Sequence, residues 1–98
     1  MVRKKIDWSI EFKEILEEIL EFYIERNGNQ RYSKSLLKQI KKSISLIANN
    51  NFIGKLTEEY NVRVIFKDNY AIFYEIKEKV VEIQLVWDTR RNPKDLQI

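Results

Sequence analysis

The sequence predicts an α+β fold: a short N-terminal strand, an antiparallel pair of helices and then a three-stranded antiparallel meander. Two patterns in the chain support this prediction. Apolar residues recur at helical spacing from residue 10 to residue 48, with a break at "NGN" (27–29), and from about residue 61 they alternate with polar residues. Helices that precede a run of strands in this way pack together on one face of the sheet.

The length and composition limit the class of protein. A chain of 98 residues builds one modest core, so we expect a single domain over residues 1–98, with residues 93–98 as a tail. The absence of Cys and His removes disulfides, thiolate metal sites and the commonest general base, so neither a metal nor a cofactor is expected. No apolar run approaches the roughly 18 residues of a membrane span and no secretory signal is present, which predicts a cytosolic protein without a membrane partner.

The first half of the chain contains the signals of one strand and two helices. Residues 2–8 are charged on one side, which suits a strand at the edge of a sheet. Ser9 is placed to cap a helix over residues 10–26, and Gly28 ends that helix because glycine readily adopts the left-handed conformation. The second helix covers residues 30–48, and the short connection makes the two helices antiparallel neighbours.

The two predicted helices carry opposite charges. Six glutamates and one lysine lie between Glu11 and Glu25, whereas seven bases and no acid lie between Arg26 and Thr57. Such segregation predicts a surface with a positive side, which favours an anionic partner.

Period-two alternation defines the strands of the second half. One face of the strand over residues 62–67 is expected to carry Val62, Val64 and Phe66, and the other Arg63, Ile65 and Lys67. Asp68-Asn69 is a turn pair before a returning strand over residues 70–76, and a second turn follows at 77–79. The same alternation places four apolar residues on one face of the last strand: Val81, Ile83, Leu85 and Trp87.

Four cations form the candidate site. Arg63 and Lys67 project from one face of their strand, and the last strand ends just before Arg90 and Arg91. If that strand lies nearby, its exit carries both arginines toward the same face. Four cations on a concave sheet would grip a phosphate backbone, and arginine can stabilise the charge that develops as a phosphodiester is attacked. An exposed pair between Arg63 and a glutamate across the sheet is the structural alternative.

Five segments, in their order and spacing, resemble the RelE/ParE superfamily of type II toxin-antitoxin toxins. The segments are "IDWS", "FKEILEEILEFYIERNGN", "LIANNNFIGKL", "VRVIFKDNYAIFYEI" and "VVEIQLVWDTRRNP". The resemblance implies a small bacterial toxin that arrests growth and is held silent by a cognate antitoxin encoded beside it. Under the resemblance, Arg63 matches the family's strand arginine, and Arg90 or Arg91 matches the basic position after the last strand.

Three functions stay open on the sequence. The first, taken as the main interpretation, is RelE-like cleavage of ribosome-bound mRNA without a metal, in which Lys67 or Glu75 would supply the base. The second is ParE-like, non-enzymatic inhibition of DNA gyrase, which the lack of histidine and of a tyrosine after Arg91 favours. The third is a non-toxic module that binds its antitoxin and reaches operator DNA only through it. Apolar residues that an antitoxin would cover are Phe52, Ile53, Ile65 and Phe73.

Overall fold

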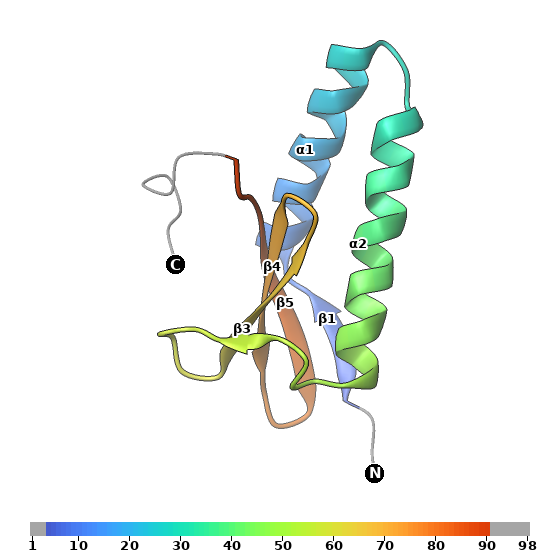
Figure 1. Cartoon of the computed structure of the whole chain (residues 1–98). Coiled ribbons are helices and arrows are strands. Elements are labelled where there is room, and N and C mark those ends of the chain that lie inside the picture. The colour runs from blue at the N-terminus through green and yellow to red at the C-terminus, as the bar shows by residue number, and fades with distance from the viewer. Residues whose placement is uncertain (1–3, 91–98) are drawn as a thin grey trace.

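The computed structural model describes residues 4–90, and within them the elements follow the predicted order (Figure 1). The elements are β1 (Lys5–Trp8), α1 (Ile10–Asn27), α2 (Arg31–Asn49), β2 (Lys55–Leu56), β3 (Val62–Lys67), β4 (Tyr70–Ile76) and β5 (Val80–Asp88). The predicted α+β class is therefore confirmed. The expected tail, residues 93–98, lies outside the described range.

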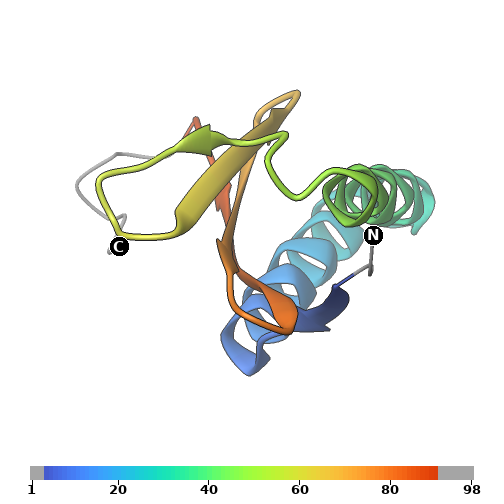
Figure 2. The same ribbon diagram turned by 90° about the horizontal axis from the view of Figure 1, so that it is seen from below.

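The strands form one mixed sheet of five strands in the order β1-β5-β4-β3-β2. β1 pairs with β5 in parallel, and the other neighbours are antiparallel. β1 lies at an edge, as its charges predict, and both helices lie on one side of the sheet (Figure 2). β2 was not predicted, because two residues at an edge leave no periodicity to detect.

The helix ends follow from local chemistry. The Ser9 hydroxyl accepts a hydrogen bond from the amide of Phe12 at 3.1 Å, which satisfies one of the free N–H groups in the first turn of α1. Gly28 ends α1 in the left-handed conformation, with φ of 70°, and its amide donates to the Ile24 carbonyl at 2.9 Å. Both features confirm the predicted cap and stop of the first helix.

The main core lies between the two helices and the sheet. Its buried residues come from α1, α2, β4 and β5: Phe12, Leu16, Ile19, Leu36, Ile40, Ile44, Ile47, Tyr70, Ile72, Tyr74, Val81, Ile83 and Val86. Ser33 is buried beside them and its hydroxyl donates to the Leu20 carbonyl at 2.6 Å, which links α2 to α1. A small polar residue there lets the two helices approach without an unpaired hydroxyl.

Alternate residues of β4 define two faces of the sheet. Tyr70, Ile72 and Tyr74 point into the main core, and we call this side the helix face. Ala71 and Phe73 point to the opposite side, which we call the far face. The far face has its own apolar cluster, formed by Val62, Val64, Ala71 and Phe73 with Leu85 and Trp87 packed against it.

A β-bulge in β5 overturns the predicted face of Leu85 and Trp87. Phe73 pairs with Leu85 and Tyr74 pairs with Ile83, so Gln84 is an extra residue in β5. Beyond this residue the alternation is shifted by one position. Val81 and Ile83 lie on the helix face as predicted, whereas Leu85 and Trp87 lie on the far face and Val86 takes their place in the main core.

No helix within residues 4–90 is long and apolar enough to cross a membrane.

Candidate functional site

Arg90 lies on the helix face, at the exit of β5. Its position follows from the bulge, because Val86, Asp88 and Arg90 alternate onto the side of the sheet that α1 covers. The guanidinium is held by the Asp88 carboxylate: Nε lies 2.9 Å from Oδ1 and Nη2 lies 2.8 Å from Oδ2. Nη2 also donates to the Tyr23 hydroxyl at 2.7 Å. A bidentate pair of this geometry orients the guanidinium plane.

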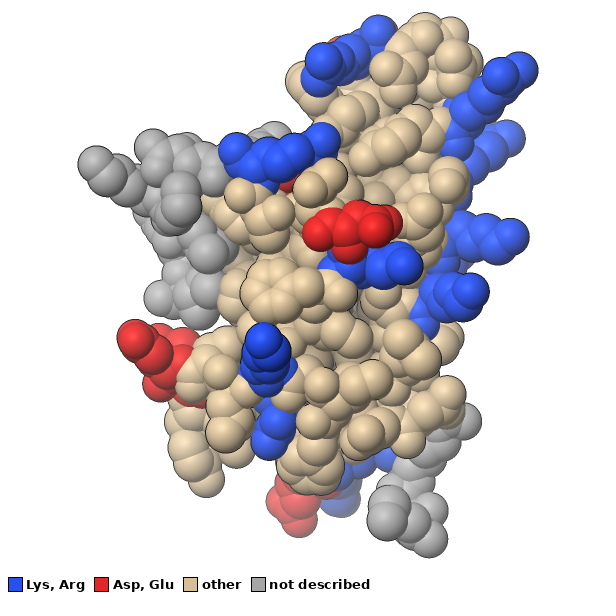
Figure 3. Space-filling view, in the orientation of Figure 1, with Lys and Arg blue, Asp and Glu red and all other residues tan. Residues whose placement is uncertain are grey.

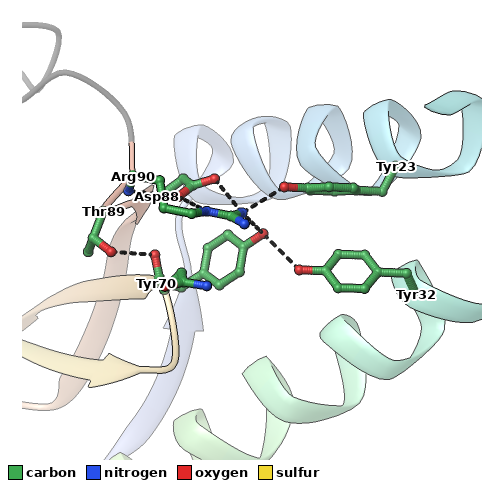
Figure 4. A network of polar contacts seen from close by, with 7 residues as sticks. Tyr23, Tyr32, Tyr70, Asp88, Thr89 and Arg90 are labelled. Carbon is green, nitrogen blue, oxygen red and sulfur yellow. Dashed lines mark hydrogen bonds and ion pairs between the residues drawn. The ribbon is translucent and has the colours of Figure 1, made fainter. Parts of the chain in front are cut away.

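Three tyrosines from different elements belong to the same network as Arg90, and Tyr32 joins it through the Tyr70 hydroxyl (Figure 4). Tyr23 comes from α1, Tyr32 from α2 and Tyr70 from β4. The hydroxyls of Tyr32 and Tyr70 lie 3.4 Å apart, and the Tyr70 hydroxyl lies 3.5 Å from Arg90 Nη2. The guanidinium carbon is 5.9 Å from the centre of the Tyr70 ring. The network therefore joins both helices to the end of the sheet.

The raised pKa of Tyr70 keeps its hydroxyl in the neutral form. Burial raises the pKa of Tyr70 far above its ordinary value, and the neighbouring hydroxyls of Tyr32 and Tyr23 raise it further. The hydrogen bonds that Arg90 donates to the Asp88 carboxylate raise the pKa of Arg90, so the guanidinium stays charged. A general base needs a pKa near the working pH. This site can donate hydrogen bonds to an anion, but Tyr70 is unsuited to removing a proton.

A pocket of about 320 Å³ opens beside Arg90. Its lining includes Asp88 and Arg90 from the end of β5, and Phe22, Tyr23 and Arg26 from the last turns of α1. Arg26 and Phe22 are exposed, and the Arg90 side chain is 48% exposed despite its pairing. The lining carries two guanidiniums and one carboxylate, so its net charge of +1 still favours an anionic group such as a carboxylate or phosphate.

Arg63 is engaged elsewhere, in the loop that follows α2. Its Nη1 donates to the Gly54 carbonyl at 2.8 Å and to the Phe52 carbonyl at 3.4 Å, and the guanidinium lies 5.0 Å from the centre of the Phe52 ring. The Tyr74 hydroxyl completes this clasp by accepting from the Gly54 amide at 2.9 Å and donating to the Asn51 carbonyl at 2.8 Å. These contacts give Arg63 a structural role, in holding the loop against the sheet.

The structure brings some of the four predicted cations together and separates others. Lys67 pairs with Tyr70 across the strands and so lies at the same end of the helix face as Arg90. Arg63 lies four residues before Lys67, about 13 Å along the strand at roughly 3.3 Å per residue. All three share the helix face, which the helices cover, rather than an open concave face. Arg91 lies outside the described residues.

The far face is acidic where it is hollow. A pocket of about 390 Å³ opens there, and four glutamates line it together with other residues. The glutamates are Glu11, Glu59, Glu75 and Glu82. Glu75 and Glu82 oppose each other on β4 and β5, and Gln84 relieves the pair by donating to Glu75 Oε1 at 2.8 Å and to Glu82 Oε1 at 3.3 Å. Within residues 4–90, no group of three or more acidic side chains is arranged to hold a metal ion. A negatively charged hollow disfavours a phosphate backbone.

Two residues of the Arg90 network, Tyr23 and Asp88, were not predicted from the sequence. Tyr23 shares the helical spacing of the apolar residues of α1, which favours the core, and Asp88 is the last residue of β5, just before the chain leaves the sheet. A usable signal existed for the first, because Tyr23 and Tyr32 lie at equal distances from the Asn27-Gly28 turn and antiparallel helices bring such positions together. No signal existed for Asp88, because its face depends on the bulge.

Comparison with protein families gives one match over most of the chain. The ParE toxin of the type II toxin-antitoxin system parDE matches residues 6–93. This range includes the whole fold except Lys5, the first residue of β1, and it includes all four predicted cations.

Two solved structures share the fold at low sequence identity. A chain from the chromosomal ParDE toxin-antitoxin system of P. aeruginosa aligns with a TM-score of 0.75 and 16% identity, covering 86% of this chain and 94% of that one. A chain from the DinJ-YafQ toxin-antitoxin complex of E. coli aligns with a TM-score of 0.58 and 9% identity, covering 91% and 96%. At these identities the likeness establishes the fold.

One curated relative is a much larger protein. RecBCD enzyme subunit RecB from Buchnera aphidicola subsp. Baizongia pistaciae (strain Bp) is 33% identical over 72 residues, which is 72% of this chain and 6% of that protein. The chain therefore spans a small part of that relative, and the likeness carries no argument about the activity of the whole enzyme.

Proposed function

Because the chain belongs to the ParE toxin family of type II toxin-antitoxin systems, we propose that it arrests growth by binding DNA gyrase and not by cleaving mRNA. The family assignment favours this alternative over RelE-like cleavage, the main interpretation of the sequence. Ribosome-dependent cleavage stays a prediction that no comparison supports.

The observation that supports this proposal is that the candidate cations do not converge on one point of the structure. Cleavage of a phosphodiester without a metal needs several cations and a base converging on one phosphate. Among the described residues, Arg63 is committed to loop carbonyls and lies at the opposite end of β3 from Lys67, and Arg90 is paired with Asp88. The burial that raises the pKa of Tyr70 argues against a tyrosine base. A binding role for Arg90 needs none of this convergence.

We propose that the cognate antitoxin covers an apolar patch formed by Phe52, Ile53 and Leu56. These side chains are 66%, 42% and 70% exposed, and they lie together in the segment between α2 and the end of β2. Exposed apolar groups gathered in one place mark protein interaction surfaces. The other two residues expected to contact an antitoxin are less available, since Ile65 is half-buried against the main core and Phe73 is 8% exposed.

A supercoiling assay tests the choice of target. Purified chain is added to purified DNA gyrase with relaxed plasmid and ATP, and in parallel to ribosomes translating a defined mRNA. We expect supercoiling to fall with increasing protein and the mRNA to stay intact. Unchanged supercoiling together with new 5′ ends inside translated codons would establish the RelE-like function instead. Intact mRNA with unchanged supercoiling would favour the non-toxic module.

A co-purification assay tests the antitoxin surface. The variant Phe52→Ser with Leu56→Ser is expressed with the antitoxin encoded beside the toxin, and recovery of the antitoxin on the tagged toxin is measured. We expect recovery to fall at least about tenfold, since apolar anchors contribute most of the binding energy of an interface. Ile10→Ser is the matched control, because Ile10 is 75% exposed but lies on α1. Equal recovery by all three proteins would place the antitoxin elsewhere.

A further inference from the structure

The outer surface of α2 carries a stripe of cations, which we call the α2 stripe. It consists of five exposed side chains: Arg31, Lys34, Lys38, Lys41 and Lys42. The spacing from Arg31 to Lys41 is three, four and three residues, which keeps these side chains on one side of a helix. At about 1.5 Å per residue they extend over roughly 15 Å. Figure 3 shows the blue side chains projecting in a row along the outer side of α2.

No acidic group balances the α2 stripe. α2 contains no Asp or Glu, and within residues 4–90 none of its five cations forms an ion pair. The exposed glutamates of the helix pair lie on α1, so the two helices present opposite charges to solvent. The chain as a whole has a net charge of +3 and a pI of about 9.1, and its positive potential is concentrated along this one helix.

The α2 stripe does not stabilise its own helix. Arg31 and Lys34 lie near the N-terminal end of α2, where the helix dipole disfavours positive charge. Lys34 and Lys38 are four residues apart, as are Lys38 and Lys42, and like charges at this spacing repel. Since these positions lower the stability of the helix, we look to a partner for their role.

The chemistry of the α2 surface favours a nucleic-acid backbone over a membrane or a protein. The apolar residues of α2 face the core, and the two exposed ones, Tyr32 and Leu46, are about 21 Å apart at roughly 1.5 Å per residue, which leaves no apolar side to insert into a bilayer. Lysines are depleted from the apolar centres of protein interfaces. Phosphate contacts are made by Lys and Arg with neighbouring hydroxyls, and the exposed Ser35 and Ser45 lie on the same helix.

We propose that the α2 stripe binds duplex DNA through its phosphates, without reading the base sequence. The geometry supports a contact along one helix, because a row of about 15 Å can reach several successive phosphates of a duplex. The acidic α1 limits this contact to the side of α2 that faces away from it. Duplex binding of this kind goes beyond gyrase inhibition and is measured without gyrase, so either proposal can fail alone.

Fluorescence anisotropy with a labelled duplex of about 20 base pairs of arbitrary sequence tests the proposal. With about four phosphates neutralised, affinity should fall roughly 10²-fold between about 50 and 200 mM salt. The variant Lys34→Gln, Lys38→Gln, Lys41→Gln should weaken binding at least about tenfold at low salt and flatten the salt dependence. Circular dichroism checks that the variant keeps its helices.

A control variant of equal charge separates the α2 stripe from net charge alone. Lys13→Gln, Lys55→Gln, Lys79→Gln removes three exposed lysines from α1, β2 and the β4–β5 turn, and we expect it to weaken binding less than about threefold. Equal losses in the two variants would overturn the proposal, because binding would then follow net charge. So would a wild-type chain that binds phosphatidylserine vesicles more tightly than the duplex, since the partner would then be an anionic lipid surface.

Discussion

The hydroxyl of Ser9 donates a hydrogen bond to the backbone carbonyl of Gln84, at 3.3 Å, while it caps the first turn of α1. The amide of Ser9 donates to the neighbouring Ile83 carbonyl at 3.0 Å. Ser9 thus fixes the bulge residue of β5 to the junction between β1 and α1. Because the bulge decides that Arg90 lies on the helix face, Ser9, near the N-terminus, helps to place the Arg90 side chain, near the C-terminus.

Replacement of Ser9 by Ala is expected to destabilise the protein. The change removes the cap of α1 and the hydroxyl contact to Gln84, and loss of an N-cap costs about 1–2 kcal/mol. Urea unfolding followed by circular dichroism measures the free energy of unfolding. Ser45→Ala serves as the control, because Ser45 is exposed within α2 and its replacement should change stability by less than about 0.5 kcal/mol. A Ser9→Ala protein as stable as the wild type would refute the role given to this cap.

Gly54→Ala is expected to destabilise the protein through a steric clash. A Cβ atom at Gly54 would lie 2.7 Å from the Tyr74 hydroxyl, 2.9 Å from Tyr74 Cε1 and 2.9 Å from the Val64 carbonyl oxygen. Overpacking of this kind costs about 1–3 kcal/mol. Urea unfolding measures the loss, and Gly28→Ala is a useful contrast, because nothing lies within 4 Å of a Cβ there and only the positive φ is unfavourable. A stable Gly54→Ala protein would mean that the Arg63–Tyr74 clasp can shift freely.

Stability is expected to fall at alkaline pH because of Tyr70 and Tyr74. Burial raises the pKa of both hydroxyls in the folded state, so the folded chain keeps its protons when the unfolded chain, with tyrosine pKa values near about 10, begins to lose them. The stabilisation is complete below the unfolded pKa and is lost as pH rises above it, by up to about 1.4 kcal/mol per pH unit for each group.

Unfolding free energies between about pH 8 and pH 11 test this prediction. In Tyr70→Phe the alkaline decline should be shallower than in the wild type, because one of the two groups is gone. Tyr60→Phe is the matched control, since Tyr60 is 89% exposed and its replacement should leave the slope unchanged. Identical slopes in all three proteins would show that the Tyr70 hydroxyl is not protected in the folded state.

Replacement of Arg90 and Arg91 by Ala is expected to abolish growth arrest. Arg90 lines a pocket together with Arg26. Tyr23 and Asp88 fix the direction of Arg90, and Arg91 follows it in the chain. Growth of cells that express the variant without antitoxin measures toxicity. The Asp88 side chain is only 13% exposed and loses its bidentate partner, so the free energy of unfolding should fall by about 1–3 kcal/mol, which urea unfolding measures.

A matched variant distinguishes the effect of removing Arg90 and Arg91 from the effect of losing two positive charges elsewhere. Lys77→Ala with Lys79→Ala removes two exposed cations from the turn between β4 and β5, and it should stay toxic. Arg90→Lys keeps the charge but cannot form the bidentate pair with Asp88, so it should retain only part of the activity. Full growth arrest by the Arg90→Ala, Arg91→Ala variant would remove these arginines from the toxic surface.

Local sequence patterns predicted the elements, because each pattern acts over a few residues. Ser9 and Gly28 bounded α1 as expected, and the alternation in residues 62–67 placed Val62 and Val64 on one face and Ile65 on the other. β2 was missed since two edge residues carry no period. The candidate site was predicted less well. Arg90 does join a polar network, but its partners Tyr23 and Asp88 were not predicted.

The sequence by itself determined both helices, every strand except β2, their order and the opposite charges of α1 and α2, because periodicity, capping and composition are local properties. The tertiary structure alone decided which face the residues of β5 after Gln84 occupy. Strict alternation along β5 predicted the wrong face for Leu85 and Trp87, because it does not allow for Gln84 as an extra residue. The bulge at Gln84 depends on how β5 pairs with Phe73 and Tyr74 of β4. The same pairing turned Arg90 toward Tyr23. A shift of one residue exchanges the two faces of a strand, and only the pairing of distant segments specifies it.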